Sequence, residues 1–231
     1  LRSLAFAPSN GDIVYAGSCR VHVKLDAGVK DSFGVFKSTN GGVKWGEAND
    51  SKTADECITA LAVHPTNPNI VYAATAANGL YKSSDGGGIW TPLSGLSPSD
   101  VRSVAIKPDQ PNTVYTGVQN GVVYRSPDGG GTWQKLDAGM DPNDAIWALV
   151  VDPVNTDVVW AGSFRTGVYR WDASQSIWVH VNAGLRTRAV TDLAISKDGE
   201  ALYATTWGEG VFRLGEVTIS SHSVFVPMAM R

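Results

Sequence analysis

An eight-residue segment recurs along this chain and marks a regular period. It reads SSDGGGIW at 83–90, SPDGGGTW at 126–133 and STNGGVKW at 38–45. The tryptophans that end these segments, followed by Trp178, stand 45, 43 and 45 residues apart. This spacing indicates a repeat protein in which each repeat is one supersecondary unit that packs on its neighbours.

A second series of positions extends the count to five units. A Val or Leu, an aromatic residue and a small residue recur at intervals of 57, 43, 45 and 43 residues. The aromatic residues are Tyr15, Tyr72, Tyr115, Trp160 and Tyr203. The longer first interval places an insertion at 20–31, whose partial alternation predicts a short additional hairpin. This hairpin is interpreted either as a lid or partner contact or as a plain surface loop.

Each unit is expected to form four short strands. The first strand has apolar residues two apart, such as Leu61 and Val63, with a small residue between them. A turn rich in Pro, Asn, Asp and Gly precedes the aromatic second strand, and the octapeptide joins strand three to strand four. Many short antiparallel strands at one period predict an all-β fold, a β-propeller of four-stranded antiparallel blades.

The predicted propeller is one domain over 1–231 with five repeat units. Blade boundaries are expected near 1–56, 57–99, 100–144, 145–188 and 189–231. The fifth unit lacks the octapeptide, and Val217–Met230 is expected to supply its outer strand. A closed five-bladed ring is the expected form. The alternative is a five-blade section of a larger ring, since the sequence starts at Leu1 and is interpreted as processed, trimmed or part of a longer protein.

The octapeptides resemble the Asp-box, or BNR motif, S-x-[DN]-x-G-x-x-W. The resemblance covers the first four units clearly, although the fourth, WDASQSIW at 171–178, keeps the final Trp and loses the glycines, and the fifth unit matches by its strands only. This resemblance implies a relation to sialidases, xyloglucan-cleaving glycoside hydrolases, sortilin-type receptors and photosystem II assembly-factor-like proteins. Membership of a fold does not transfer an activity.

The Asp-box residues are interpreted as turn staples and not as catalytic groups or calcium ligands. The Asp or Asn accepts hydrogen bonds from its own turn, the glycines permit the turn, and the Trp is buried. With one box at the edge of each blade, the carboxylates are too far apart to act together. The residues are Ser38, Asn40, Trp45, Ser83, Asp85, Trp90, Ser126, Asp128 and Trp133.

Ligand-binding residues are expected on the opposite face, in the loops after the second strands and at the starts of the inner strands. Thr59 and Thr191 share a repeat position there with three of the candidates. Aromatic rings beside arginines suit a sugar, a carboxylate or a peptide; the alternative is an ordinary solvated rim. The candidates are Arg2, Arg102, Trp147, Phe164, Arg165, Arg186, Arg188, Asp192, Trp207 and Glu209.

The function expected is a non-catalytic binding propeller for a saccharide or protein partner. Glycoside hydrolysis needs two carboxyl groups across a cleft, and no pair stands out among the acids of this face. The Arg-Ile-Pro sequence of sialidases is absent near the start. No catalytic residue is therefore assigned, and the alternative is a glycoside hydrolase of xyloglucanase or sialidase type, or a fragment of one.

The net charge and the two cysteines limit which classes of binding partner and which cellular compartment are expected. A net charge of −3 without a Lys/Arg cluster argues against nucleic acid, and the longest apolar run, 145–151, is too short to span a bilayer. The four histidines lack metal-ligand spacing, so neither a metal nor a cofactor is expected. Cys19 and Cys57 map to one face of adjacent blades. They are either a disulfide, which suits an extracellular or periplasmic protein, or reduced thiols. The oligomeric state is left open.

Overall fold

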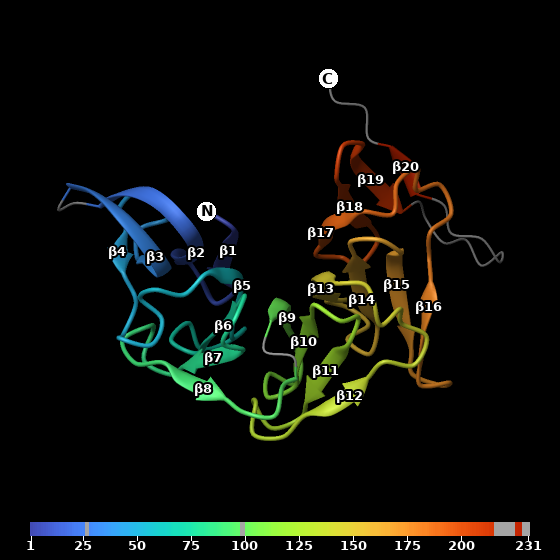
Figure 1. Cartoon of the computed structure of the whole chain (residues 1–231), viewed down its shortest axis with the longest axis horizontal. Helices are drawn as coiled ribbons and strands as arrows, with labels where there is room; N and C mark the ends of the chain where they lie inside the picture. Colours follow the sequence, from blue (N-terminus) through green and yellow to red (C-terminus); the bar gives the residue numbers. More distant parts are fainter. Residues whose placement is uncertain (26–27, 98–99, 215–224, 228–231) are drawn as a thin grey trace.

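The computed structural model describes residues 1–25, 28–97, 100–214 and 225–227 as strands and turns, with no helix that could cross a membrane. Its strands form five four-stranded sheets, here called blades 1 to 5 (Figure 1). Their bounds are β1 (Ser3–Ala7), β2 (Asn10–Leu25), β3 (Gly28–Ser38) and β4 (Gly46–Glu47); β5 (Ile58–Val63), β6 (Val71–Thr75), β7 (Leu80–Ser83) and β8 (Thr91–Leu93); β9 (Val101–Ile106), β10 (Val114–Val118), β11 (Val123–Ser126) and β12 (Gln134–Leu136); β13 (Ile146–Val151), β14 (Val159–Ser163), β15 (Gly167–Asp172) and β16 (Ile177–His180); β17 (Val190–Ile195), β18 (Leu202–Thr206), β19 (Gly210–Leu214) and β20 (Phe225–Pro227). The predicted all-β propeller of four-stranded antiparallel blades is confirmed.

The strands of each blade pair in chain order, each antiparallel to the next. The predicted additional hairpin forms as an extension of β2 and β3, which stay paired as far as Leu25 and Gly28. Blade 5 obtains its outer strand from the expected segment, because Phe225–Pro227 pairs with β19. Residues 217–224 and 228–230 of that segment lie outside the described residues.

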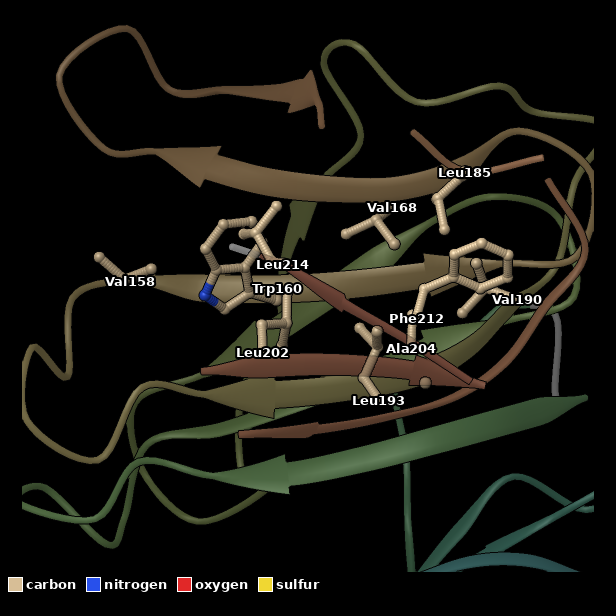
Figure 2. Packing of buried hydrophobic residues seen from close by; sticks show 11 residues of the cluster. Val158, Trp160, Val168, Leu185, Val190, Leu193, Leu202, Ala204, Phe212 and Leu214 are labelled. Carbon is tan, nitrogen blue, oxygen red and sulfur yellow. The ribbon is translucent and has the colours of Figure 1, made fainter. Parts of the chain in front are cut away.

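The hydrophobic core is divided among the interfaces between consecutive blades. Between blades 1 and 2, Tyr15 packs in one cluster with Ile58, Leu61 and Trp90. Figure 2 shows the corresponding core between blades 4 and 5, where Trp160 and other blade 4 side chains meet Leu193, Ala204 and Phe212. In each interface, side chains from the second strand of one blade thus pack against the first strand of the next blade.

Close approach between blades requires a small residue near the end of each second strand. A Cβ added at Gly17 would lie 2.9 Å from the Cβ of Ile58, and one added at Gly117 would lie 2.7 Å from the Cβ of Ile146. Real Cβ atoms do not approach this closely, so the backbone of one blade contacts the inner strand of the next. Glycine at these positions is a packing requirement.

The blades form an open arc, and the closed five-bladed ring expected from the sequence is not seen. Blades 1 and 5 are the two ends of this arc in Figure 1. Consecutive inner strands pack together from β1 through β17, whereas β1 and β17 do not pack on each other in this way. Leu4 and Phe6 of β1 are consequently 53% and 62% exposed.

Candidate functional site: the mouth of the central channel

The Asp-box turns are built by short-range hydrogen bonds. In blade 2, Ser83 Oγ donates to Asp85 Oδ1 at 2.8 Å, and the backbone N–H groups of Gly88 and Ile89 donate to the same oxygen. Gly87 has φ +100°, a conformation that favours glycine. Its N–H donates to Ser83 Oγ at 2.8 Å. The carboxylate therefore completes a turn.

The same geometry occurs in the other two boxes. The Thr132 backbone N–H and hydroxyl, with the Ser126 hydroxyl, lower the pKa of Asp128 to about 2. In blade 1 the amide oxygen of Asn40 accepts from Ser38 Oγ and Lys44 N. A neutral amide thus accepts the corresponding bonds in blade 1, so this kind of turn can form without a charge.

A cavity of about 450 Å³ opens at the other face of the blades. One residue near the start of the inner strand of each blade lines this cavity, always at the same repeat position. Blade 5 adds residues from the connection between β18 and β19. The lining residues are Arg2, Thr59, Arg102, Trp147, Thr191, Thr206, Trp207 and Gly208. The repeat position identified in the sequence therefore forms one ring at the mouth of the channel.

A second cavity of about 560 Å³ shares Arg2, Thr59, Trp147 and Thr191 with the first and continues along the inner strands. Asp192 lines it. Water reaches this carboxyl group, yet the surrounding strands raise its pKa by burial, and the hydrogen bond from the Leu193 N–H offsets part of that rise. The channel is thus polar at its mouth and carries one acid deeper inside.

Aromatic side chains form one wall of the mouth. The Trp147 and Phe164 rings are stacked, with centroids 4.7 Å apart, and Phe164 meets Trp207 edge to face at 6.3 Å. Trp207 remains 68% exposed. This arrangement leaves a large flat ring available beside a rigid aromatic pair.

Repeated backbone bonds position Phe164 and Trp207. Each follows the last residue of a second strand, and its N–H donates to the residue just before the inner strand, Ala145 or Ala189. At Trp207 the hairpin is also closed by a bond from Thr206 Oγ1 to the Gly210 carbonyl at 3.0 Å. The repeat thus delivers both rings to the same level.

A buried acid that the sequence did not single out fixes the loop bearing Phe164. Asp144 is 1% exposed, and its carboxylate accepts from Arg165 N, Thr166 N and Thr166 Oγ1. It also accepts from the Ala145 N–H at 2.7 Å. The one feature of the sequence that pointed to Asp144 was its position two residues before an inner strand. Glu56 lies at the same distance before β5 and is not buried in this way, so that position alone does not predict a buried acid.

The two arginines at the mouth differ in their partners. The Arg102 guanidinium is 2.7 Å from Asp100 Oδ2. Arg2 has no ion pair with any residue in the described part of the chain. The Arg2 side chain is exposed, so its donors face the cavity and solvent.

The remaining candidates do not line either cavity. Arg165 reaches Asp144 only through its backbone, and its side chain is exposed. Arg188 lies near His180, where burial first and this positive charge second lower the histidine pKa. Arg186 and Glu209 are exposed elsewhere on the surface. Of the ten candidates, the structure brings together Arg2, Arg102, Trp147, Phe164, Asp192 and Trp207.

A disulfide joins Cys19, which lies within β2 where the pairing with β3 shifts register between Ser18 and Val21, to Cys57, just before β5. It connects blades 1 and 2 on the face that carries the cavity. Among the described residues no group of three or more His, Cys, Asp or Glu side chains is arranged to hold a metal ion.

Comparison with known proteins identifies the fold. No protein-family model and no curated protein sequence matches the chain. Among solved structures, an ancestral GH74 enzyme aligns with TM-score 0.71 and 21% identity over 96% of this chain and 30% of its own. The Niastella koreensis GH74 enzyme aligns with TM-score 0.71 and 18% identity over 97% of this chain and 38% of its own.

A YCF48 protein bound to a D1 peptide aligns with TM-score 0.64 and 16% identity, covering 98% of this chain and 68% of that one. The chain thus spans about a third of the GH74 enzymes and two thirds of YCF48. The similarity to Asp-box propellers that the repeats predict is confirmed at the level of the fold.

Proposed function

We propose that the protein is a non-catalytic binding propeller that holds an acidic polypeptide segment of a partner protein in the cavity at the channel mouth. The observation that carries this proposal is the combination of two groups around one cavity: the Arg2 guanidinium, which has no ion pair with a described residue, and the exposed Trp207 ring. Guanidinium groups bind carboxylates through paired hydrogen bonds, and tryptophan provides a flat apolar surface.

The polar groups at the mouth favour a ligand rich in hydrogen-bond acceptors. The threonine hydroxyls are engaged within the protein: Thr59 donates to the Val101 carbonyl, Thr206 donates to the Gly210 carbonyl, and Thr191 pairs with Thr205. Among the described residues, the side-chain donors left for a ligand include those of the arginines and the Trp147 indole N–H, which has no hydrogen-bond partner. A carboxylate therefore complements this mouth better than a neutral sugar does.

The fold similarity supports a peptide ligand as a class, since one similar propeller is a YCF48 protein bound to a D1 peptide. A saccharide is the second candidate, because sugars stack on exposed tryptophan and the Trp147–Phe164 pair supports such a surface. The Cys19–Cys57 disulfide supports an extracellular or periplasmic location.

The alternative glycoside hydrolase activity would require a pair of carboxyl groups. Asp192 is the one acid among the described residues that line the two cavities. A binding role therefore accounts for the site with fewer assumptions than hydrolysis.

The experiment measures binding of a library of acidic peptides, their amidated neutral counterparts and xyloglucan oligosaccharides. We expect an acidic peptide to bind, with Arg2→Gln and Trp207→Ala each weakening it roughly tenfold or more, and with added salt weakening it further. The control is Arg186→Gln, which removes an exposed arginine outside the cavity.

Three results would contradict the proposal. Equal loss of binding in all three variants would place the ligand elsewhere, and preference for the oligosaccharides would favour the second candidate. Release of reducing sugar that disappears in Asp192→Asn would show that the protein is an enzyme.

A further inference from the structure

An asparagine at the start of the connection from blade 4 to blade 5 holds the turn behind the aromatic wall of the mouth. Asn182 Oδ1 accepts from the Val168 N–H at 2.7 Å, and its Nδ2 donates to the Thr166 carbonyl at 2.8 Å. A Cβ added at Gly167, which has φ +100°, would collide with this amide. The side chain therefore bonds to or packs against three consecutive residues where β15 begins.

Asp144 holds the same turn through separate bonds. Thr166 donates to the Asp144 carboxylate through its N–H at 2.8 Å and through its hydroxyl at 2.7 Å. Phe164 lies two residues before Thr166 and stacks on Trp147 in the wall of the mouth. The position of Phe164 therefore depends on two anchors, which are the carboxylate of Asp144 and the amide of Asn182.

The second hydrogen of the Asn182 amide goes to a histidine. Asn182 Nδ2 is 3.1 Å from His180 Nδ1. Because the Val168 N–H requires the amide oxygen and the Thr166 carbonyl requires one amide hydrogen, the remaining hydrogen points to this ring nitrogen. His180 Nδ1 must therefore accept, and the neutral ring carries its proton on Nε2. The amide makes all three bonds only while the histidine is neutral.

The surroundings of His180 favour that neutral ring. Tyr169, its cross-strand partner on β15, lies against it with ring centroids 4.2 Å apart. Burial first and the positive charge of Arg188 second lower the pKa of His180 below its ordinary value. Among the residues that the structure describes, Tyr169 and Arg188 are the titratable or charged groups found to act on this ring. Part of the ring stays open to solvent, so protons reach it.

We propose that His180 and Asn182 form a pH-dependent latch that fixes the aromatic wall of the mouth and thereby regulates binding there. The regulation of binding rests on the function proposed above. In acid, Nδ1 of His180 takes up a proton and becomes a donor, so two N–H groups face each other at this contact. Rotation of the amide by half a turn would restore that bond but would break the bonds to Thr166 and Val168. At least one bond of the latch is therefore lost in either orientation.

The direction of the pH dependence follows from the lowered pKa. Because the pKa of His180 is lower in the folded chain than its ordinary value of 6.5, the unfolded state binds more protons in mild acid. The latch is therefore complete above about pH 6.5 and is lost as pH falls through the lower folded value. We expect Phe164 to be held against Trp147 near neutral pH and the turn to loosen in mild acid.

The test measures hydrogen exchange of the Thr166 and Val168 amides at about pH 7.5 and pH 5, as protection factors corrected for the intrinsic effect of pH on exchange. We expect protection to fall roughly fivefold or more at the lower pH, the effect of about one lost hydrogen bond. His180→Asn places an amide oxygen where Nδ1 lies and does not titrate, so protection in this variant is expected to stay constant. Asn182→Ala is expected to give low protection at both pH values.

Blade 1 contains a matched control within the same chain. Asn49 Oδ1 accepts from the Val35 N–H at 2.6 Å, as Asn182 does from Val168, but Glu47 stands in place of His180. We expect the protection of Val35 to be the same at the two pH values. An equal fall at Val35 and Val168, or an equal fall in the unsubstituted chain and His180→Asn, would overturn the proposal.

Binding provides the second measurement. The dissociation constant of a hexa-aspartate peptide is measured for the unsubstituted chain and His180→Asn at both pH values, since aspartate with a pKa of about 3.9 stays ionised throughout. We expect equal affinities near neutral pH and roughly fivefold or more weaker binding by the unsubstituted chain in acid. The same pH dependence in both proteins would overturn regulation of the mouth. A peptide that binds neither protein would overturn the function proposed above and with it the regulation, while hydrogen exchange still decides the latch.

Discussion

Replacement of Trp90 by alanine measures how much an Asp-box tryptophan contributes when a blade covers it. The indole is fully buried in the core between blades 1 and 2. Its Nε1 donates to Ala48 and also to Gly87 within its own turn. Trp→Ala substitutions in cores cost about 3–5 kcal/mol, and the lost hydrogen bond costs about 1 kcal/mol more. We expect the free energy of unfolding to fall by about 4–6 kcal/mol.

The matched control is Trp45→Ala, which removes the same residue from the same repeat position. Trp45 is half-buried and bonds within its own turn, so its loss is expected to cost about 1–2 kcal/mol. The two variants differ in whether a preceding blade covers the ring. Their difference therefore isolates the interface from the turn.

The assay is urea unfolding followed by far-ultraviolet circular dichroism, with thermal unfolding as a second measure. A chain of this size loses about 2–4 °C of Tm per kcal/mol, so Trp90→Ala is expected to lower Tm by roughly 10 °C and Trp45→Ala by a few degrees. Equal costs for the two variants would refute the reasoning, because they would mean that the ring of Trp45 is as well covered as that of Trp90.

Three further predictions concern the disulfide, the acid response and blade spacing. Replacing Cys19 and Cys57 with serine removes a bridge across a sequence separation of 38 and is expected to cost about 3–4 kcal/mol in urea unfolding; an intact mass without the loss of two hydrogens would show that no bridge forms. Because the folded pKa of Asp128 is about 2, below its ordinary value, its carboxylate stabilises the fold at neutral pH and this contribution is lost as pH falls from about 4 to 2. Asp128→Asn is expected to flatten the fall of the urea midpoint over that range; an unchanged profile would contradict this. Gly117→Ala is expected to cost about 1–3 kcal/mol, because the added Cβ would overpack against Ile146 of the next blade. Thr205 occupies the equivalent position of blade 5, the last blade of the arc, so Thr205→Ala is expected to be nearly neutral; equal effects would contradict the packing argument.

The strand pattern and the Asp-box turns were predictable because they depend on local interactions. The apolar residues two apart in β5 and β9 recur in every inner strand, and the bonds of Asp85 span at most four residues. The ring of inner-strand positions also followed from the repeat, since equivalent residues of equivalent blades must lie at one level around the channel. Arg2, Arg102 and Trp147 were placed together for this reason.

For residues outside the repeated strands, it was less predictable from the sequence which of them line the cavity at the channel mouth. Arg186 and Arg188 belong to a connection between blades, and their exposed side chains do not line either cavity. The role of Asp144 also escaped sequence reasoning, because three of its four donors, Arg165 N, Thr166 N and Thr166 Oγ1, belong to a loop more than 20 residues further along the chain. Loop geometry is decided by such contacts and not by local pattern.

The sequence by itself determined the repeat, the blade composition, the turn staples and the face on which the cavity lies, because each depends on residues within one unit. Only the tertiary structure decided that the five blades form an open arc and that the mouth includes a stacked Trp147–Phe164 pair beside an unpaired Arg2. The physical reason is that ring closure is a contact between the first and last units. Leu4 is exposed at the open end of the arc, although the pattern of its own strand is the same as in the covered blades.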